Sequence, residues 1–238
     1  MEGSVLVVGG SGGLGKEICK QERKLGHIVT STWCNNIPSG AEGVMQHQLD
    51  LSNQGSIGRF LDCLSDEEVL FKRVYFASAI NGQGKIDDIC TFESGQVPNK
   101  TPKYMQINCL SIIQIMHHLI YKNLLTCDAK ICALTSVAGS SSLRGLMVHN
   151  QSGGNLSYRL SKAALNCSVR NIAYDLESCG RQVIVCTVYP GWVKTTSSSP
   201  EAPNEPRDAV SRLLTVMKDI TQRQNGLMLD LDGIPLPF

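Results

Sequence analysis

The chain has 238 residues, of which 42% are hydrophobic and 18% are charged. This length and composition are typical of one globular domain with a sizeable core, so we expect a single domain spanning residues 1–238. Lys and Arg number 22 and Asp and Glu 21, which gives a formal net charge of +1. Such a balance does not favour nucleic acid or an anionic membrane as a partner.

The ten cysteines do not have the spacing of a disulfide framework or of a metal site. No Cys-x-x-Cys pair occurs and no histidine lies at a zinc-site spacing, so we expect no metal. Cys63, Cys109, Cys132, Cys167 and Cys186 lie in apolar stretches, where a free cysteine behaves as a small hydrophobic residue. We therefore expect free thiols and a reducing, cytoplasmic location.

Neither a signal peptide nor a membrane span is expected. The first apolar strand begins at about Ser4, which leaves no room for a signal peptide before it. The most apolar helical segment, Ile107–Tyr121, is interrupted by Asn108 and other polar residues, so we do not expect it to cross a membrane.

Short β-branched runs alternate with longer amphipathic segments along the chain. The short runs predict strands at Ser4–Val8, His27–Thr32, Val44–Gln48, Lys72–Ala77, Lys130–Thr135, Gln182–Val188 and Leu227–Leu229. The amphipathic segments predict helices at Leu14–Leu25, Gln54–Leu64, Lys103–Leu125, Ser157–Cys179 and Pro206–Ile220. This alternation predicts an α/β fold with one Rossmann-type, doubly wound parallel sheet of about seven strands and helices on both faces.

A glycine-rich run follows the first strand directly and opens the first helix. Glycines permit a tight turn and close approach of a pyrophosphate, while the helix N-terminus supplies free N–H groups and positive dipole charge. The run therefore predicts dinucleotide contacts from Gly9, Ser11, Gly12, Gly13, Leu14 and Gly15. Its glycines fit three spacings at once (9-13-15, 10-12-15 and 9-12-15), so the run alone does not distinguish the protein classes that use them.

The end of the second predicted strand bears on which dinucleotide is bound. No acidic residue occurs between Glu22 and Glu42, so the carboxylate that would bond the ribose of NAD and repel a 2′-phosphate is absent. The arginine or lysine that would pair with such a phosphate is absent from this strand end too, which leaves Ser31, Asn35 and Asn36 as neutral donors. We expect NADP in preference to NAD, with NAD as the alternative.

A tyrosine and a lysine four residues apart, Tyr158 and Lys162, lie on one face of a predicted helix. A nearby ammonium is expected to lower the tyrosine pKa from its ordinary value of about 10, which would favour proton exchange near neutrality. Reduction of a carbonyl needs such a proton at oxygen when hydride reaches carbon. Tyrosine and lysine four residues apart are common on solvated helices. This pair indicates catalysis only in combination with the glycine run upstream.

Taken together, these features resemble the short-chain dehydrogenase/reductase family over nearly the whole chain. The resemblance implies a catalytic tetrad of Asn108 in Gln-Ile-Asn, Ser136 in Leu-Thr-Ser-Val-Ala-Gly, Tyr158 and Lys162. It also implies cofactor contacts, with Asp50 at the adenine ring and Pro190, Gly191, Val193, Thr195, Tyr158 and Lys162 towards the nicotinamide. The stretches Asn150–Asn166 and Asn225–Phe238 resemble the subgroup containing C-factor and the carbonyl reductase Sniffer.

The resemblance implies an NAD(P)-dependent reductase of small carbonyl compounds, or in reverse of alcohols. Tyr158 would be the general acid, Ser136 would hydrogen-bond the carbonyl oxygen, and Lys162 would lower the Tyr158 pKa and hold the nicotinamide ribose. Asn108 would position a water that connects Lys162 to solvent. His117, His118 and His149 are not paired with a nucleophile, so we do not assign them as bases.

Two departures from the family pattern affect the cofactor site. Ala77–Ile80 stands where the family usually has Asn-Asn-Ala-Gly, and Ile80 would be bulky where the backbone passes close to the cofactor. Val8 replaces a threonine that makes a structural hydrogen bond. The alternative function is a dinucleotide-binding signalling or scaffold protein without turnover. A nucleotide-sugar epimerase is disfavoured, because only about 48 residues follow Pro190.

Two irregular segments are expected near the substrate. Gly139–Ser157 would form a wall lined by Leu146, His149 or Asn150, and Ser197–Glu205 would form only a small lid, so we expect an open pocket. The apolar faces of the helices predicted at 103–125 and 157–179 would suit packing on their own sheet or against a second copy, which makes a homodimer one alternative.

Overall fold

A computed structural model describes residues 3–35, 43–67, 69–81, 100–146, 154–195 and 201–238, and the statements below concern these residues. Eight strands form one sheet in the order β3-β2-β1-β4-β5-β6-β7-β8. They are β1 (Ser4–Val8), β2 (Ile28–Trp33), β3 (Val44–Gln48), β4 (Phe71–Phe76), β5 (Leu125–Leu134), β6 (Ile184–Val188), β7 (Met228–Leu229) and β8 (Pro235–Leu236). Neighbours pair in parallel except β7 and β8, which are antiparallel.

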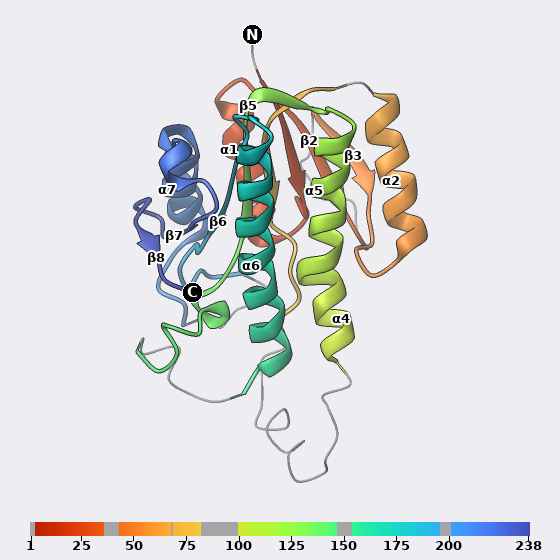
Figure 1. Cartoon of the computed structure of the whole chain (residues 1–238). Coiled ribbons are helices and arrows are strands. Elements are labelled where there is room, and N and C mark those ends of the chain that lie inside the picture. The colour runs from red at the N-terminus through yellow and green to blue at the C-terminus, as the bar shows by residue number, and fades with distance from the viewer. Residues whose placement is uncertain (1–2, 36–42, 68, 82–99, 147–153, 196–200) are drawn as a thin grey trace.

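Helices cover both faces of this sheet, as the fold prediction requires (Figure 1). One layer contains α2 (Gln54–Asp66), α4 (Thr101–Met105), α5 (Ser111–Tyr121) and α6 (Leu156–Ser178). The opposite layer contains α1 (Gly13–Lys24) and α7 (Pro206–Asp219), which pack on each other. The strand order turns back between β1 and β4, so ligands are expected at the carboxyl ends of these central strands.

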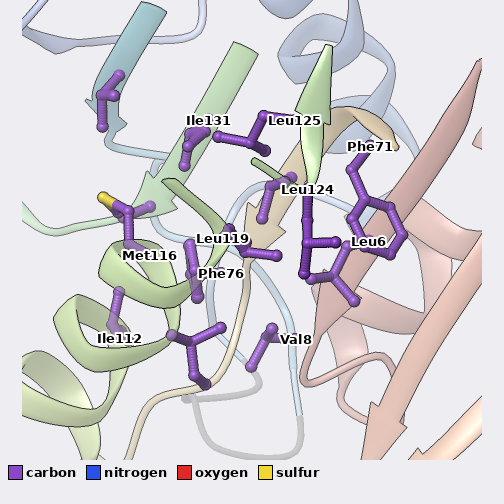
Figure 2. Packing of buried hydrophobic residues seen from close by; sticks show 14 of the residues in the cluster. Leu6, Val8, Phe71, Phe76, Ile112, Met116, Leu119, Leu124, Leu125 and Ile131 are labelled. Atoms are coloured by element: carbon purple, nitrogen blue, oxygen red, sulfur yellow. The ribbon is translucent and has the colours of Figure 1, made fainter. Parts of the chain in front are cut away.

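The strand sequences are almost continuously apolar because both faces of the sheet are buried. Along β1, Leu6 and Val8 point into the cluster under α5 and α6, whereas Val5 and Val7 point into the cluster under α1 and α7. Figure 2 shows Leu6, Val8 and Phe76 of the sheet beside Ile112, Met116 and Leu119 of α5. Each fully buried side chain of this kind contributes about 1.5–3 kcal/mol to folding.

The fold class is confirmed, with differences at the ends of some elements. The helix predicted to reach Leu125 ends at Tyr121, because Asn123 adopts a left-handed conformation with φ of 55°. The Leu124 N–H then donates to the Leu119 carbonyl at 2.9 Å, and β5 begins at Leu125 rather than at Lys130. The antiparallel strand β8 was not predicted; it has two residues and begins with a proline, which is depleted in strands.

A buried carboxylate fixes the far end of α1 to the sheet. Glu22 is fully buried and accepts hydrogen bonds from the Tyr75 hydroxyl at 2.6 Å and from Arg73 Nη1 at 3.0 Å to each carboxylate oxygen. Its second oxygen also lies 2.6 Å from Nδ1 of His27. Burial, and then the Glu22 charge, raise the pKa of Tyr75 well above its ordinary value. Because α1 begins at the glycine run, these contacts also orient that run.

The described cysteines are free thiols, but not all of them are buried as expected. Cys109, Cys132 and Cys186 are buried, whereas Cys63 and Cys167 are exposed on the outer sides of α2 and α6. The apolar stretches around these two belong to amphipathic helices, and the cysteines fall on the solvent side. No helix in the described ranges is both long and apolar enough to cross a membrane.

Candidate active site

A cavity of about 840 Å³ opens at the carboxyl ends of the strands. Loops after β1, β2, β3, β4, β5 and β6 all contribute to its wall, as a doubly wound sheet requires. The predicted residues that line it are Gly9, Ser11, Gly12, Gly13, Leu14, Asp50, Ser136, Tyr158, Lys162, Pro190, Gly191, Val193 and Thr195. Of the predicted site residues, Gly15 and Asn108 lie behind this wall and support it.

The glycine run fits a phosphate group. Gly9 has φ of 93°, and a Cβ built there would lie 2.2 Å from Ser78 Oγ. The N-cap of α1 is Gly12, so no side chain caps the first-turn N–H groups, and the first turn contains no acidic residue. Free N–H groups and the positive end of a 12-residue helix therefore face the cavity.

Most glycines of the run are packed tightly against the chain. A Cβ on Gly15 would lie 2.1 Å from the Gly9 carbonyl oxygen, and a Cβ on Gly10 would lie 1.9 Å from Ser31 Oγ. A Cβ on Gly13 would lie 2.9 Å from Thr195 Cγ2, at the end of a side chain. A Cβ on Gly12 would meet the protein only at 3.6 Å, an ordinary contact, so the side of Gly12 is open.

Asp50 and Asn35 lie at the opposite end of the cavity from the tyrosine. Oδ1 of Asp50 accepts from the Ser52 hydroxyl at 2.7 Å and from its N–H at 2.8 Å, and these two bonds lower the pKa of the Asp50 carboxyl. Asn35 follows β2 and lines the wall, as predicted for a phosphate donor. Ser31, by contrast, is 1% exposed and lies against the Gly10 backbone, so its side chain is not available to a ligand. Asn36 lies outside the described residues.

Ser136, Tyr158 and Lys162 form one wall of the cavity. Ser136 caps the short 3-10 turn η3 (Val137–Gly139), where its Oγ accepts from the Ala138 N–H at 3.1 Å. A Cβ on Gly139 would lie 2.6 Å from the Lys162 backbone, so only glycine lets this turn pack directly on α6. Lys162 Nζ lies 5.9 Å from the Tyr158 ring centroid and donates to the Leu134 carbonyl at 2.7 Å.

The protonation of this wall differs from the sequence-based expectation. Burial raises the pKa of Tyr158 to about 12, and only the hydrogen bond with Ser136 acts in the opposite direction. Burial also lowers the pKa of Lys162 to about 8, against a smaller effect of Cys109. The expectation that Lys162 lowers the Tyr158 pKa is therefore wrong for this structure, because desolvation dominates and the opposing effect comes from Ser136. At neutral pH the phenol keeps its proton.

Asn108 lies in a single π-helical turn, η2 (Gln106–Leu110), between α4 and α5. Its side chain is fully buried and binds both backbone groups of Ile80: Oδ1 accepts from the N–H at 2.8 Å and Nδ2 donates to the carbonyl at 2.9 Å. Nδ2 also donates to Ser161 Oγ at 3.0 Å. Asn108 thus connects the loop after β4 to α6 through its side chain.

Comparison with known proteins decides the family. A family model described as enoyl-(acyl carrier protein) reductase matches residues 40–225, which is most of the chain. The chain belongs to the short-chain dehydrogenase/reductase family. The sequence-based expectation of an NAD(P)-dependent oxidoreductase is confirmed at the level of this family.

Two curated relatives and two solved structures illustrate this membership. C-signal of Myxococcus xanthus is 35% identical over 106 residues, which are 44% of this chain and 63% of that protein. A 1-hydroxy-2-glutathionyl-2-methyl-3-butene dehydrogenase of Rhodococcus is 25% identical over 97% of both chains. The carbonyl reductase Sniffer of D. melanogaster and an NADPH-bound carbonyl reductase from chicken fatty liver each superimpose with a TM-score of 0.82, at 19% and 20% identity, over at least 99% of both chains. The expected resemblance to C-factor and Sniffer is thereby confirmed.

The structure shows how the chain is held at the two departures from the family pattern. Ile80 lines the cavity, and its backbone is held on both sides by Asn108. Thr32 of β2 accepts from the Gly9 N–H at 2.9 Å, so the amide that follows Val8 has a partner from the neighbouring strand.

Several lining residues were not singled out from the sequence. Tyr189, Trp192, Asn155 and Arg159 contribute to the wall near Tyr158. Asn155 and Arg159 could have been suspected from the sequence, because they flank Tyr158 at the start of its predicted helix. In the structure Asn155 is the N-cap of this helix and has a left-handed conformation, with φ of 57°. Leu146 is exposed and does not line the described wall; His149 and Asn150 lie outside the described residues, as do residues 197–200 of the predicted lid.

Proposed function

We propose that this chain reduces a small carbonyl compound to an alcohol with an NAD(P)H cofactor, with NADP preferred. The observation that carries the proposal is the single cavity that contains the glycine cradle at one side and Ser136, Tyr158 and Lys162 at the other. No group of three or more potential metal ligands lies among the described residues. When bound, the dinucleotide would supply the hydride, and the chain's residues would supply binding, orientation and the proton.

Tyr158 would donate its hydroxyl proton to the carbonyl oxygen. Its pKa of about 12 keeps the phenol protonated at neutral pH, and an alkoxide is a stronger base than a phenolate, so transfer to the product oxygen is favourable. Ser136 would hydrogen-bond the same oxygen as negative charge develops there. Lys162 is 2% exposed with a pKa of about 8, so at neutral pH it mainly places a positive charge beneath this site.

The preference for NADP rests on the end of β2. Asn35 lines the cavity there, and no carboxylate follows this strand within the described residues up to Asn35. A neutral hydrogen-bond donor can bind the 2′-phosphate of NADP without the repulsion that a carboxylate would cause. The NADP-bound solved relatives have the same fold, which supports the choice without deciding it.

We also propose that the protein is cytoplasmic and forms a homodimer. Nine described free cysteines support a reducing compartment such as the cytoplasm. Exposed Leu110, Leu160 and Tyr174, on the turn before α5 and on α6, support a homodimer through this helical layer. Sedimentation of the purified protein at micromolar concentration tests the dimer.

The decisive experiment follows NADPH and NADH oxidation over quinones, diketones and aldehydes. Tyr158→Phe should lower kcat/KM by at least about 100-fold, because general acid catalysis typically contributes 10²–10⁴-fold. Tyr174→Phe is the matched control, since it removes an exposed hydroxyl from the same helix. Tight NADPH binding with no turnover of any carbonyl would instead favour the dinucleotide-binding signalling protein.

A further inference from the structure

The turn that carries Ser136 is held from behind by Ser140, a buried residue that is not part of the described cavity wall. Ser140 directly follows η3 and is 2% exposed. Its Oγ donates to the Pro237 carbonyl at 2.6 Å and accepts from the Leu143 N–H at 3.0 Å. One hydroxyl therefore acts as donor and acceptor at once, and it connects η3, the turn after η3 and the segment that follows β8.

The backbone of η3 connects Ser140 to Ser136 over a single short turn. The Gly139 N–H donates to the Ser136 carbonyl at 2.9 Å, and the Ser140 N–H donates to the Val137 carbonyl at 3.1 Å. Ser136 Oγ accepts from the Ala138 N–H at 3.1 Å, so the position of this oxygen depends on the same turn. A displacement of Ser140 is therefore transmitted to the Ser136 hydroxyl.

The acceptor that anchors Ser140 is itself fixed. Pro237 directly follows β8, which pairs with β7, and the next residue, Phe238, has its ring 5.7 Å from the Arg170 guanidinium of α6. Figure 1 shows this end of the chain beside the turn that follows β5. Against α6, the turn has no room to move, because a Cβ on Gly139 would already lie 2.6 Å from the Lys162 backbone.

We propose that Ser140 is a positioning residue for carbonyl reduction, which holds Ser136 where its hydroxyl bonds the substrate oxygen. The inference rests on the proposed function, because Ser140 acts only through Ser136. The Ser136 hydrogen bond gains strength as negative charge develops on that oxygen, and its strength depends steeply on distance and angle. A misplacement of about 1 Å in such a group can lower the rate on the order of 100-fold.

The test is a double-mutant cycle between Ser140 and Ser136. The measured quantity is kcat/KM with NADPH for the quinone, diketone or aldehyde that the wild-type protein reduces fastest. Ser140→Ala should lower it by about 10–100-fold, because the turn loses its anchor. In the Ser136→Ala background the same change should lower it by less than about 2-fold, because no hydroxyl remains to be misplaced.

Two controls separate positioning from general loosening of the fold. Ser178→Ala removes an exposed hydroxyl that donates to the Tyr174 carbonyl at 2.7 Å, and it should leave kcat/KM unchanged in both backgrounds. The Kd of NADPH, measured by fluorescence titration, should also stay unchanged in Ser140→Ala. If that variant does not fold, the cycle is run with Ser140→Cys, which keeps a side chain of similar shape with a weak donor and acceptor.

The outcomes distinguish the inference from the function on which it rests. Equal falls in kcat/KM in both backgrounds, no fall in the wild-type background, or a matching loss of NADPH affinity would refute the role of Ser140 while the reductase stands. If the wild-type protein reduces none of the carbonyl compounds, the proposed function and the inference fail together.

Discussion

Replacing Asn108 by alanine should destabilise the protein well beyond the effect of an ordinary surface substitution. The side chain is fully buried and makes three hydrogen bonds of 2.8, 2.9 and 3.0 Å, two of them to the backbone of Ile80 and one to Ser161. Each such bond contributes about 1 kcal/mol net, and leaving the partners unsatisfied adds to the cost. We therefore expect the free energy of unfolding to fall by about 3 kcal/mol.

For a protein of this size, 1 kcal/mol corresponds to about 2–4 °C in Tm, so the expected decrease is roughly 6–12 °C. Differential scanning calorimetry without cofactor measures it directly. Asn171→Ala is the matched control, because Asn171 is exposed and its Nδ2 bonds only within its own helix, to the Cys167 carbonyl at 2.8 Å and to its sulfur. A loss below 1 kcal/mol, or one equal to that of Asn171→Ala, would refute the role of Asn108 as the connection between the β4 loop and α6.

Two other predictions concern the cradle and the lysine. Gly15→Ala should abolish NADPH binding or folding, because its Cβ would lie 2.1 Å from the Gly9 carbonyl oxygen. Gly12→Ala is the control and should change Tm little, since its Cβ would meet the protein only at 3.6 Å. Equal losses of Tm in the two variants would contradict this packing. The pKa of Lys162 is lowered from 10.5 to about 8. The destabilisation caused by burying its charged form is therefore largest below pH 8 and decreases as pH rises towards 10.5. The stability gained by Lys162→Met should therefore shrink by roughly 2 kcal/mol between pH 7 and pH 9.5 in urea titrations, and a constant gain would contradict the lowered pKa.

Residue pattern alone was enough to predict the doubly wound fold and the glycine run at its edge. Alternation of apolar strands with amphipathic helices predicted the parallel sheet, whose strands bring their carboxyl ends to one edge. Ser136 and Pro190 were assigned from the family resemblance, and the structure places them with Gly9 in one cavity. The spacing of Tyr158 and Lys162 on one helix needed no tertiary information.

The remaining features depend on packing that sequence periodicity does not report. The Tyr158 pKa is raised rather than lowered because of burial, which is a property of the whole fold and which the four-residue spacing to Lys162 does not report. Ser31 resembled a phosphate donor, but the strand turns its side chain to the Gly10 backbone. The helix end at Tyr121 depended on one left-handed residue, Asn123, within an apolar run that continues into β5.

The π-helical turn at Gln106–Leu110 has a consequence for sequence length in this helix. Asn108 and Cys109 are buried within the turn, and Ile112 and Ile115 are buried in the helix that follows. A π-helical turn holds one residue more than an α-helical turn, so the flanking helices α4 and α5 would keep their faces if one residue were removed and the turn became α-helical. The residues within the turn would instead change direction, and Asn108 would lose the position from which it binds Ile80 and Ser161. The extra residue of this turn is therefore what aims the buried asparagine, while the core face of α5 does not depend on it.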